Sequence, residues 1–478
     1  MEDAPPPFWA PGGLRFDKET SAALDAAVAA PLKQTADPDT RLEAKWNAAY
    51  EPPEAEAYDC MIADEERANK YQQAIKQRMA GHEGEFVVVD IGTGPYALLA
   101  LMAARAGAKR VYAIEASPWA ARRARSCVER ATDVPAGVVT VIDGLSTDVT
   151  LPEKADLLVA ELVGSVCTEE GLLCSMRDAV ERHVLRPDDP ASYIPVRCQT
   201  MCAPASHALH YVLAPPSFDW VDGLKGQALR TSCWDTAVEA LSTPQLLEDV
   251  AFHEKPLPPP GAYRPPVLEF TVGDSHVERA SANYLGTLRR EGLPLESAAP
   301  LAAAIAHSLS GLACWPRLEL DVDGEIVLES RGPNGEPVER SEHATHWQTV
   351  LPLLAPRPVP LAPGDTVRLS VAFDVPKHVD EATGYELKGD IQRGGVKPSA
   401  PVVVRFHRTD DVSIAEDCEP PVHRGSHHDS ESGAGSSDGE LTHEDDDGME
   451  YTLVVEPAWL TSQLEWVALQ RSAEALVS

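Results

Sequence analysis

Residues 86–94 read FVVVDIGTG, an apolar run that ends in Asp90 and is followed by Gly92 and Gly94. The helix-forming stretch ALLALMAARAGA comes soon after. A short apolar run, a glycine turn and a helix form the opening unit of an α/β sheet. The unit recurs at 110–115, which again ends in an acid, and further apolar runs follow at 138–143 and 155–161. We therefore predict a Rossmann-like α/β domain with a doubly wound, mostly parallel sheet.

The sequence pattern changes after residue 195. β-branched stretches broken by Pro and Gly follow, among them 318–322, 366–373 and 402–406, and this pattern is typical of antiparallel strands. We predict a partly disordered leader over 1–48, the α/β domain with its N-terminal helices over 49–195, and a mainly antiparallel domain over 196–478. Inside the last part, an apolar pattern that includes Trp234, Ala237 and Leu241 predicts an inserted helical element over about 217–250.

Acidic side chains dominate the composition. The 75 Asp and Glu residues outnumber 41 Lys and Arg residues, which gives a formal net charge of -34. Residues 410–450 alone hold fourteen acidic residues and one arginine, so we predict a disordered insert over about 409–449 that cannot bury enough apolar area to fold. This balance argues against direct nucleic-acid or anionic membrane partners, which need clustered Lys and Arg, and it favours basic partners.

Neither a secretory signal nor an apolar run of eighteen residues stands in the sequence, so we expect a cytoplasmic or nuclear protein. The nine cysteines are scattered and form no C-x-x-C pair. We therefore expect free thiols and no metal site.

The glycine turn alone leaves the function open. Gly92 and Gly94 let backbone amides approach a ligand, and together with Ala97 they satisfy the pattern G-x-G-x-x-A. Glu115, at the end of the next predicted strand, can hydrogen-bond two ribose hydroxyls. Nicotinamide-dependent oxidoreductases share these features, so that function stays open here, as does a non-catalytic acidic protein that binds basic partners.

Two glutamates nine positions apart narrow the range of possible functions. Residues 161–170 read ELVGSVCTEE, which places Glu161 and Glu170 after the fourth predicted strand, and Thr345-His346-Trp347 stands far along the chain. Together these motifs resemble the protein arginine methyltransferases, in which a loop with two glutamates at this spacing is accompanied by a Thr-His-Trp loop from a β-barrel. Segments 58–71, 110–115, 146–149 and 384–390 match further motifs of that family in the same order.

The resemblance implies a fold, a reaction and partners. The domain over 196–478 would be a β-barrel, and the element over 217–250 its helical arm for homodimerisation. The chain would transfer a methyl group from S-adenosylmethionine to arginine in protein substrates such as Arg-Gly-rich proteins or histones. The product stays open among mono-, asymmetric and symmetric dimethylarginine. Pro95-Tyr96 and residues 161–165 resemble the symmetric branch, and Met61 and the intact Thr-His-Trp lean toward the asymmetric branch. Residues 58–64 and 146–149 look closer to the monomethylating branch.

The resemblance also implies roles for individual residues. Glu161 and Glu170 would grip the substrate guanidinium, and His346 would pair with Asp64 to lock the barrel loop onto the N-terminal helix; these four form the expected catalytic set. Substrate contacts are expected besides from Trp347 and Tyr58. The cofactor-binding residues would be Met61, Arg67, Asp90, Gly92, Gly94, Glu115, Ser146 and Thr147.

Physical chemistry supports a pair of glutamates for this reaction. A guanidinium is a planar cation with five donors, so two fixed carboxylates can hold it bidentately and direct one nitrogen at a methyl donor. Alignment of this kind supplies much of the acceleration of a transfer reaction. Glu169 stands beside Glu170, and the second position of the clamp could fall on either of them, although the spacing favours Glu170.

Overall fold

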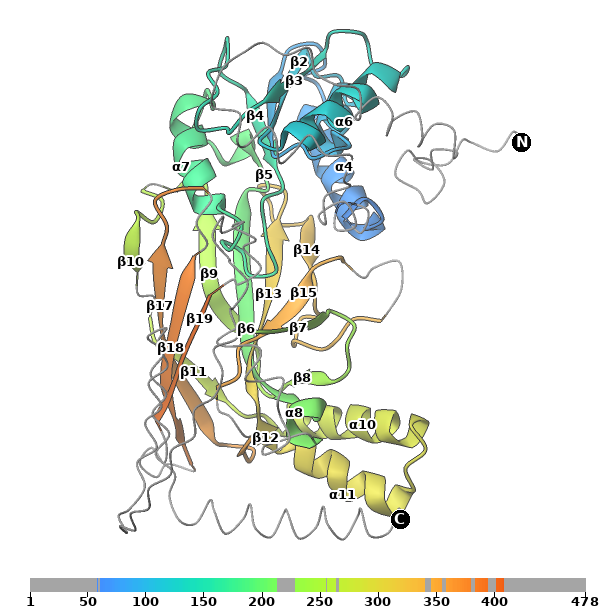
Figure 1. Cartoon of the computed structure of the whole chain (residues 1–478), viewed down its shortest axis with the longest axis vertical. Helices are drawn as coiled ribbons and strands as arrows, with labels where there is room; N and C mark the ends of the chain where they lie inside the picture. Colours follow the sequence, from blue (N-terminus) through green and yellow to red (C-terminus); the bar gives the residue numbers. More distant parts are fainter. Residues whose placement is uncertain are drawn as a thin grey trace, which may run out of the picture.

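The structure is a computed structural model of the chain (Figure 1). It describes residues 58, 61–212, 228–254, 256–263, 266–339, 345–354, 358–379, 383–393 and 401–407. The predicted leader over 1–48, the acidic insert over about 409–449 and the elements predicted beyond it lie outside the described residues.

Five parallel strands form the first domain, in the order β3-β2-β1-β4-β5. Their bounds are β1 Val87–Ile91, β2 Arg110–Glu115, β3 Val139–Asp143, β4 Leu157–Ala160 and β5 Tyr193–Ile194. The central strands β1 and β4 are buried along their whole length, as their continuous apolar runs require. The predicted parallel sheet is confirmed, and the strand order reverses between β1 and β4.

Within the described residues, four α-helices accompany this sheet, and local signals set where two of them begin. They are α4 Glu65–Met79, α5 Leu98–Arg105, α6 Pro118–Arg130 and α7 Leu172–Arg182. Asp64 caps α4 by accepting from the amide of Arg67, and Ser117 caps α6 with Pro118 at the first helical position. Gly171, with φ of 73°, precedes α7, so this helix starts directly after the predicted glutamate loop.

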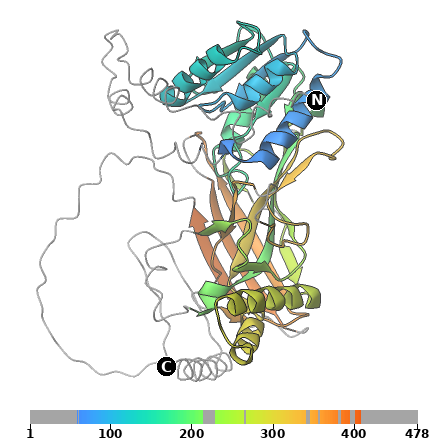
Figure 2. The same cartoon turned by 90° about the vertical axis from the view of Figure 1, so that its right-hand side faces the viewer.

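The second domain consists of antiparallel sheets. One sheet has the order β7-β15-β13-β6-β8, with β14 on β13 and β9 on β6; another has the order β10-β17-β18-β19, with β11 on β17; β12 pairs with β16. Figure 2 shows these strands running below the parallel sheet, with the helix pair α10 and α11 at the far end. The bounds are β6 Arg197–His207, β7 Leu229–Ser232, β8 Val238–Ala240, β9 Gln245–Ala251, β10 Gly261–Tyr263, β11 Leu268–Thr271, β12 Ser308–Leu309, β13 Gly311–Glu319, β14 Val327–Glu329, β15 Gln348–Leu351, β16 Val359–Pro360, β17 Thr366–Val375, β18 Gly384–Gln392 and β19 Pro401–His407, with α8 Ala208–Val212, α10 Asp274–Arg290, α11 Leu295–Ala306 and the short 3-10 turn η1 Pro190–Ser192.

The helix predicted over about 217–250 is wrong for the part that the structure describes. Residues 229–251 form β7, β8 and β9, while 213–227 lie outside the described residues. The backbone groups of these strands find partners on β15 and β6, and Thr243-Pro244 interrupts the run between β8 and β9. Among the described residues, the long helices of this domain are α10 and α11, for which no helix was predicted.

One continuous hydrophobic core joins the two domains. Its buried members include Val163 and Val166 of the glutamate loop, Leu173 just after it, and Phe252 and Trp347 from the antiparallel domain. A dry contact of this kind fixes how the loop sits between the domains. Among the helices that the structure describes, none is long and apolar enough to cross a membrane.

Candidate functional site

A cavity of about 530 Å³ opens beyond the carboxyl ends of β1, β2 and β4, where the strand order reverses. Open α/β sheets bind their ligands at this place. Residues from the turns after these strands line the cavity, together with the segment before α4 and Val379 from the antiparallel domain. Of the residues predicted for the site, the lining includes Tyr58, Met61, Arg67, Gly92, Gly94, Glu115, Ser146, Glu161 and Glu170.

The glycine turn presents bare backbone to this cavity. Gly92 and Gly94 have φ of 72° and 66°, a conformation that other residues rarely adopt. A Cβ atom on Gly92 would lie 2.6 Å from Cδ2 of Leu162, so a side chain there would force Leu162 to move. The ring of Tyr58 lies beside Gly94. A Cβ atom built on Gly94 would be 3.6 Å from Cε1 of Tyr58.

Asp90 lies beneath the turn and does not line the cavity. Its Oδ2 accepts from Oγ1 of Thr93 at 2.5 Å and from the amide of Ala100 at 3.0 Å, which ties the turn to the start of α5. Burial raises the pKa of Asp90 to about 7, although both hydrogen bonds act in the opposite direction. The structure therefore gives this carboxyl a supporting position.

Glu115 ends β2 with both carboxylate oxygens oriented by backbone amides. Oε2 accepts from the amide of Gly94 and Oε1 from the amide of Ser117, each at 2.8 Å. Burial raises the pKa of Glu115, while the backbone hydrogen bonds oppose that rise. Since each carboxylate oxygen can accept more than one hydrogen bond, a neighbouring pair of ligand hydroxyls can still bind here.

Ser146 faces the same end of the cavity. Its carbonyl oxygen accepts from Nη2 of Arg182 at 2.8 Å and lies 2.9 Å from Nε2 of His183. These contacts hold the segment after β3 against α7. The neighbouring Thr147 is half-buried and does not line the cavity.

Arg67 and Glu161 form a buried ion pair at the wall of the cavity. Nη1 of Arg67 donates to Oε2 of Glu161, and Nη2 donates to the carbonyl oxygen of Met61 at 2.6 Å. The Nε atom of Arg67 is buried and has no hydrogen-bond partner. Oε1 of Glu161 accepts from the amide of Val163 at 3.2 Å, so its own loop helps to orient this glutamate.

Glu169 and Glu170 both line the cavity but differ in their surroundings. Glu169 is buried, and its two oxygens accept from the guanidinium of Arg230 on β7 at 2.5 and 3.3 Å. Glu170 is exposed at the surface of the cavity. The ion pair holds Glu169 against β7, whereas Glu170 is the more exposed of the two carboxylates at the cavity. No sequence pattern predicts Arg230, because only the fold brings β7 to the loop.

His346 and Asp64 are in direct contact. Oδ2 of Asp64 lies 2.8 Å from Nδ1 of His346 and also accepts from the amide of His346 at 2.8 Å. Burial alone would raise the pKa of Asp64, but the contacts with His346 and the amide of Arg67 outweigh it, so the pKa is lowered. The loop before β15 is thereby attached to the start of α4.

Trp347 is buried and is not among the residues that line the cavity. Its Nε1 donates to the carbonyl oxygen of Val163 at 2.7 Å, and the amide of Gln348 donates to Oγ of Ser165 at 3.0 Å. The Thr-His-Trp segment therefore supports the glutamate loop from the side of the antiparallel domain.

Comparisons with known proteins agree with this geometry. No family model matches the chain. Over 128 residues the chain is 41% identical to "Protein arginine N-methyltransferase PRMT10" of Oryza sativa subsp. japonica, which covers 27% of this chain and 32% of the rice protein. Over 273 residues it is 29% identical to "Probable histone-arginine methyltransferase CARM1" of Oryza sativa subsp. indica, with coverage of 53% and 44%. Over these segments the chain is similar to proteins named as protein arginine N-methyltransferases.

Two solved structures of the family share the fold. A crystal structure of protein arginine methyltransferase 10 from Arabidopsis thaliana aligns with a TM-score of 0.53 and 19% identity, over 74% of this chain and 97% of that one. The Trypanosoma brucei PRMT1 enzyme-prozyme heterotetrameric complex with AdoHcy aligns with a TM-score of 0.52 and 16% identity, over 73% and 97%. The predicted fold, a Rossmann-like domain followed by a barrel-like antiparallel domain, is confirmed. The sequence matches above cover a third to less than half of the curated relatives' length.

Proposed function

We propose that this chain transfers a methyl group from S-adenosylmethionine to a guanidinium nitrogen of arginine in protein substrates. One observation carries the proposal: Glu115, the acid suited to a ribose, lines the same cavity as Glu161 and Glu170, the acids suited to a guanidinium. Under this proposal a nucleoside site and an arginine site adjoin within one cavity.

The residues of the cavity fit the cofactor. The bare turn at Gly92 and Gly94 leaves room for a ligand against the backbone, and Glu115 retains acceptor capacity for a ribose diol. The buried Nε of Arg67 has no partner in the protein and can donate to a carboxylate such as that of the methionyl portion. Bound there, the cofactor would supply an electrophilic methyl group on a sulfonium.

The protein's own task is to hold and orient the substrate. Glu161 and Glu170 would accept hydrogen bonds from the guanidinium and offset its charge, which leaves one nitrogen directed along the cavity. Glu161 meets the substrate from a position already fixed by Arg67 and by the amide of Val163. Orientation by groups that need not move during the reaction is an efficient source of rate acceleration.

His346 and Asp64 would act by completing the site. Their contact closes the antiparallel domain onto the start of α4, the helix that carries Arg67. The bond from Trp347 to Val163 fixes the glutamate loop from the same side. We therefore assign both His346 and Trp347 to positioning of the loop, rather than to direct substrate contact.

The substrate and assembly are part of the proposal. The rice relative is named a histone-arginine methyltransferase, and the Trypanosoma structure is titled a heterotetrameric complex. We propose Arg-Gly-rich proteins or histones as substrates and a homodimer as the working form, in the cytoplasm or nucleus. Sedimentation that shows only monomer at micromolar concentration contradicts the dimer.

Two measurements test the activity. Thermal stabilisation by S-adenosylhomocysteine, with no stabilisation by NAD, is expected and separates the proposal from a nicotinamide-dependent oxidoreductase. Mass spectrometry of an Arg-Gly peptide and of a histone after incubation with S-adenosylmethionine is then expected to show methylarginine and to identify the product. A protein that binds the cofactor product but methylates neither substrate contradicts the proposed function.

A further inference from the structure

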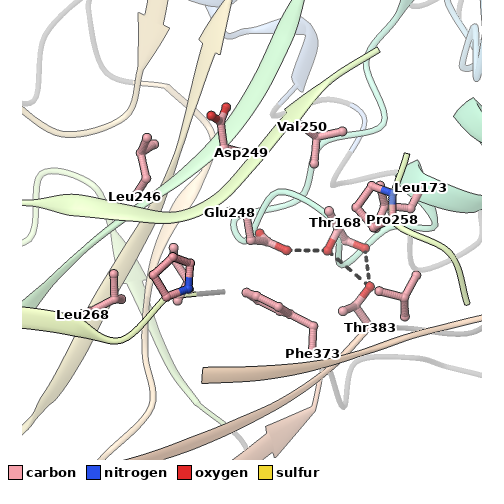
Figure 3. A pocket seen from close by; sticks show the side chains of 13 residues that line it. Thr168, Leu173, Leu246, Glu248, Asp249, Val250, Pro258, Leu268, Phe373 and Thr383 are labelled. Atoms are coloured by element: carbon pink, nitrogen blue, oxygen red, sulfur yellow. Dashed lines mark hydrogen bonds between the residues drawn. The ribbon is translucent and has the colours of Figure 1, made fainter. Parts of the chain in front are cut away.

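Thr168 stands in the loop between the two proposed clamp residues, and a carboxylate of the antiparallel domain holds it. Its hydroxyl donates to Oε1 of Glu248 on β9 at 2.5 Å. Figure 3 shows Thr168, Glu248 and Thr383 meeting at the wall of a second cavity of about 300 Å³. Most other residues around this cavity are apolar, such as Phe373, so the contact lies in a dry setting.

Three hydroxyl groups converge on the buried carboxylate of Glu248. Thr168 and Tyr385 donate to Oε1, the latter at 3.0 Å, and Thr200 donates to Oε2. Thr200 belongs to β6 of one antiparallel sheet and Tyr385 to β18 of the other. A single side chain thus joins both sheets to the loop from the parallel domain.

The neighbouring backbone of the loop is tied to the same group. The amide of Cys167 donates to Oγ1 of Thr200 at 2.8 Å, and the hydroxyl of Thr200 passes the connection on to Glu248. The hydroxyl of Thr383 donates to the carbonyl oxygen of Thr168 at 3.0 Å. Residues 167 and 168 are therefore fixed by backbone and side chain together.

We infer that Glu248 is a positioning residue for methyl transfer, which acts through Thr168 to hold the loop that carries Glu161 and Glu170. This inference rests on the proposed function. Glu248 is absent from the lining of the cofactor cavity, so it touches neither of the proposed ligands there.

The dry setting makes the carboxylate hard to replace. Burial raises the pKa of Glu248, and the hydroxyls of Thr168, Thr200 and Tyr385 lower it in return. Removal of the carboxylate leaves three buried hydroxyls without their common acceptor, and each unsatisfied group is costly. A shift of the loop would let these hydroxyls find other acceptors. A displacement of about 1 Å near reacting groups can lower the rate about 100-fold.

The test uses Glu248→Ala and Glu248→Gln in the full chain. Glutamine keeps an oxygen for Thr168 and Tyr385, and its amide can donate to Thr200 once that hydroxyl rotates. We expect kcat on an Arg-Gly peptide to fall by about 100-fold in the alanine variant and to stay within about 5-fold of wild type in the glutamine variant. The affinity for S-adenosylhomocysteine is expected to change by less than about 3-fold in both, because the cofactor lining is intact.

Asp249→Asn is the matched control. Asp249 follows Glu248 on the same strand but is exposed, and it accepts from Arg197 on the outer surface at 2.8 Å. In Figure 3 its side chain points away from Thr168. This variant is expected to keep the kcat of the wild type.

A second readout does not need turnover. Amide hydrogen exchange in residues 161–171 of the unliganded protein is expected to accelerate in the alanine variant and to stay slow in the glutamine variant. If folded Glu248→Ala keeps the kcat and the amide hydrogen exchange of the wild type, the inference is wrong. It is also wrong if kcat falls only in proportion to the fraction of unfolded protein. If the alanine variant does not fold, Thr168→Val replaces it, with the same expected directions.

The proposed function and the positioning role of Glu248 can be contradicted independently. If the wild-type protein binds S-adenosylhomocysteine and methylates nothing, the proposed function fails, while hydrogen exchange still decides whether Glu248 holds the loop. If the wild type methylates the peptide and the Glu248 variants behave like Asp249→Asn, only the positioning role fails.

Discussion

Arg67 and Glu161 are joined across the wall of the cavity, with Nη1 of the arginine donating to Oε2 of the glutamate. Arg67 comes from the first turn of α4, and Glu161 follows β4. The residue proposed for the cofactor carboxylate and the residue proposed for the substrate therefore orient each other. Occupation of the cofactor end is expected to influence the glutamate at the substrate end.

Glu161→Gln removes the negative charge of this side chain and nearly keeps its shape. The amide keeps an oxygen for Nη1 of Arg67 but loses the negative charge that the guanidinium substrate needs. We expect kcat for methyl transfer to fall by about 100-fold, the scale for loss of one electrostatic contact to a reacting group. The Kd for S-adenosylhomocysteine, measured by titration calorimetry, is expected to stay within about 3-fold of wild type. A variant that methylates at the wild-type rate would falsify the clamp role of Glu161.

Arg67→Gln is expected to act at the opposite end of the pair. It removes the guanidinium, whose buried Nε has no hydrogen-bond partner in the protein. It also leaves Glu161 without its buried positive partner. We expect the Kd for S-adenosylhomocysteine to rise roughly 10- to 100-fold, the value of one or two charge-assisted hydrogen bonds. Lys70→Gln, one turn along α4 and paired with Glu66, is the control and should bind as wild type does.

Glu169 and Glu170 can be told apart by comparing stability with activity. Glu169→Gln weakens the part-buried ion pair with Arg230, so we expect it to lower the melting temperature. Glu170→Gln alters an exposed side chain and is expected to leave the melting temperature unchanged while kcat falls by about 100-fold. The reverse pattern would move the second clamp position to Glu169.

The sequence predicted the parallel domain well because each strand carries its own signal. The runs at 110–115 and 138–143 are apolar and end where a turn begins, and the structure places strands at Arg110–Glu115 and Val139–Asp143. The contact between His346 and Asp64 was also predicted, although 282 positions separate them. That expectation came from the resemblance to a family, since local pattern says nothing about such distant partners.

Other features could not be predicted from local pattern. The apolar spacing predicts a helix over about 217–250, but pairing with β6 and β15 forms strands within 229–251. Trp347 was expected beside the substrate and instead donates to Val163 from a buried position. Arg230, Glu248 and Val379 reach the glutamate loop only through tertiary contacts, and each lies far from it in sequence.

Asp90 makes the unliganded protein sensitive to pH. Its pKa in the folded state is about 7, against an ordinary value of 3.8, because the carboxyl is buried. Between these values the folded protein retains a proton that the unfolded chain releases. The stabilising contribution of Asp90 is therefore fully present below about pH 4 and is lost as the pH rises through 7.

Asp90→Asn removes this titration while an amide oxygen can still accept from Thr93 and Ala100. We expect the free energy of unfolding of wild type, relative to the variant, to decline from pH 5 to pH 7 by up to about 1.4 kcal/mol per pH unit, the slope for one proton. Urea unfolding at pH 5, 6, 7 and 8 without ligand measures it. Asp148→Asn, on the surface of the same domain, is the control. A difference between wild type and Asp90→Asn that stays constant over this range means that Asp90 is already ionised in the folded protein at pH 5.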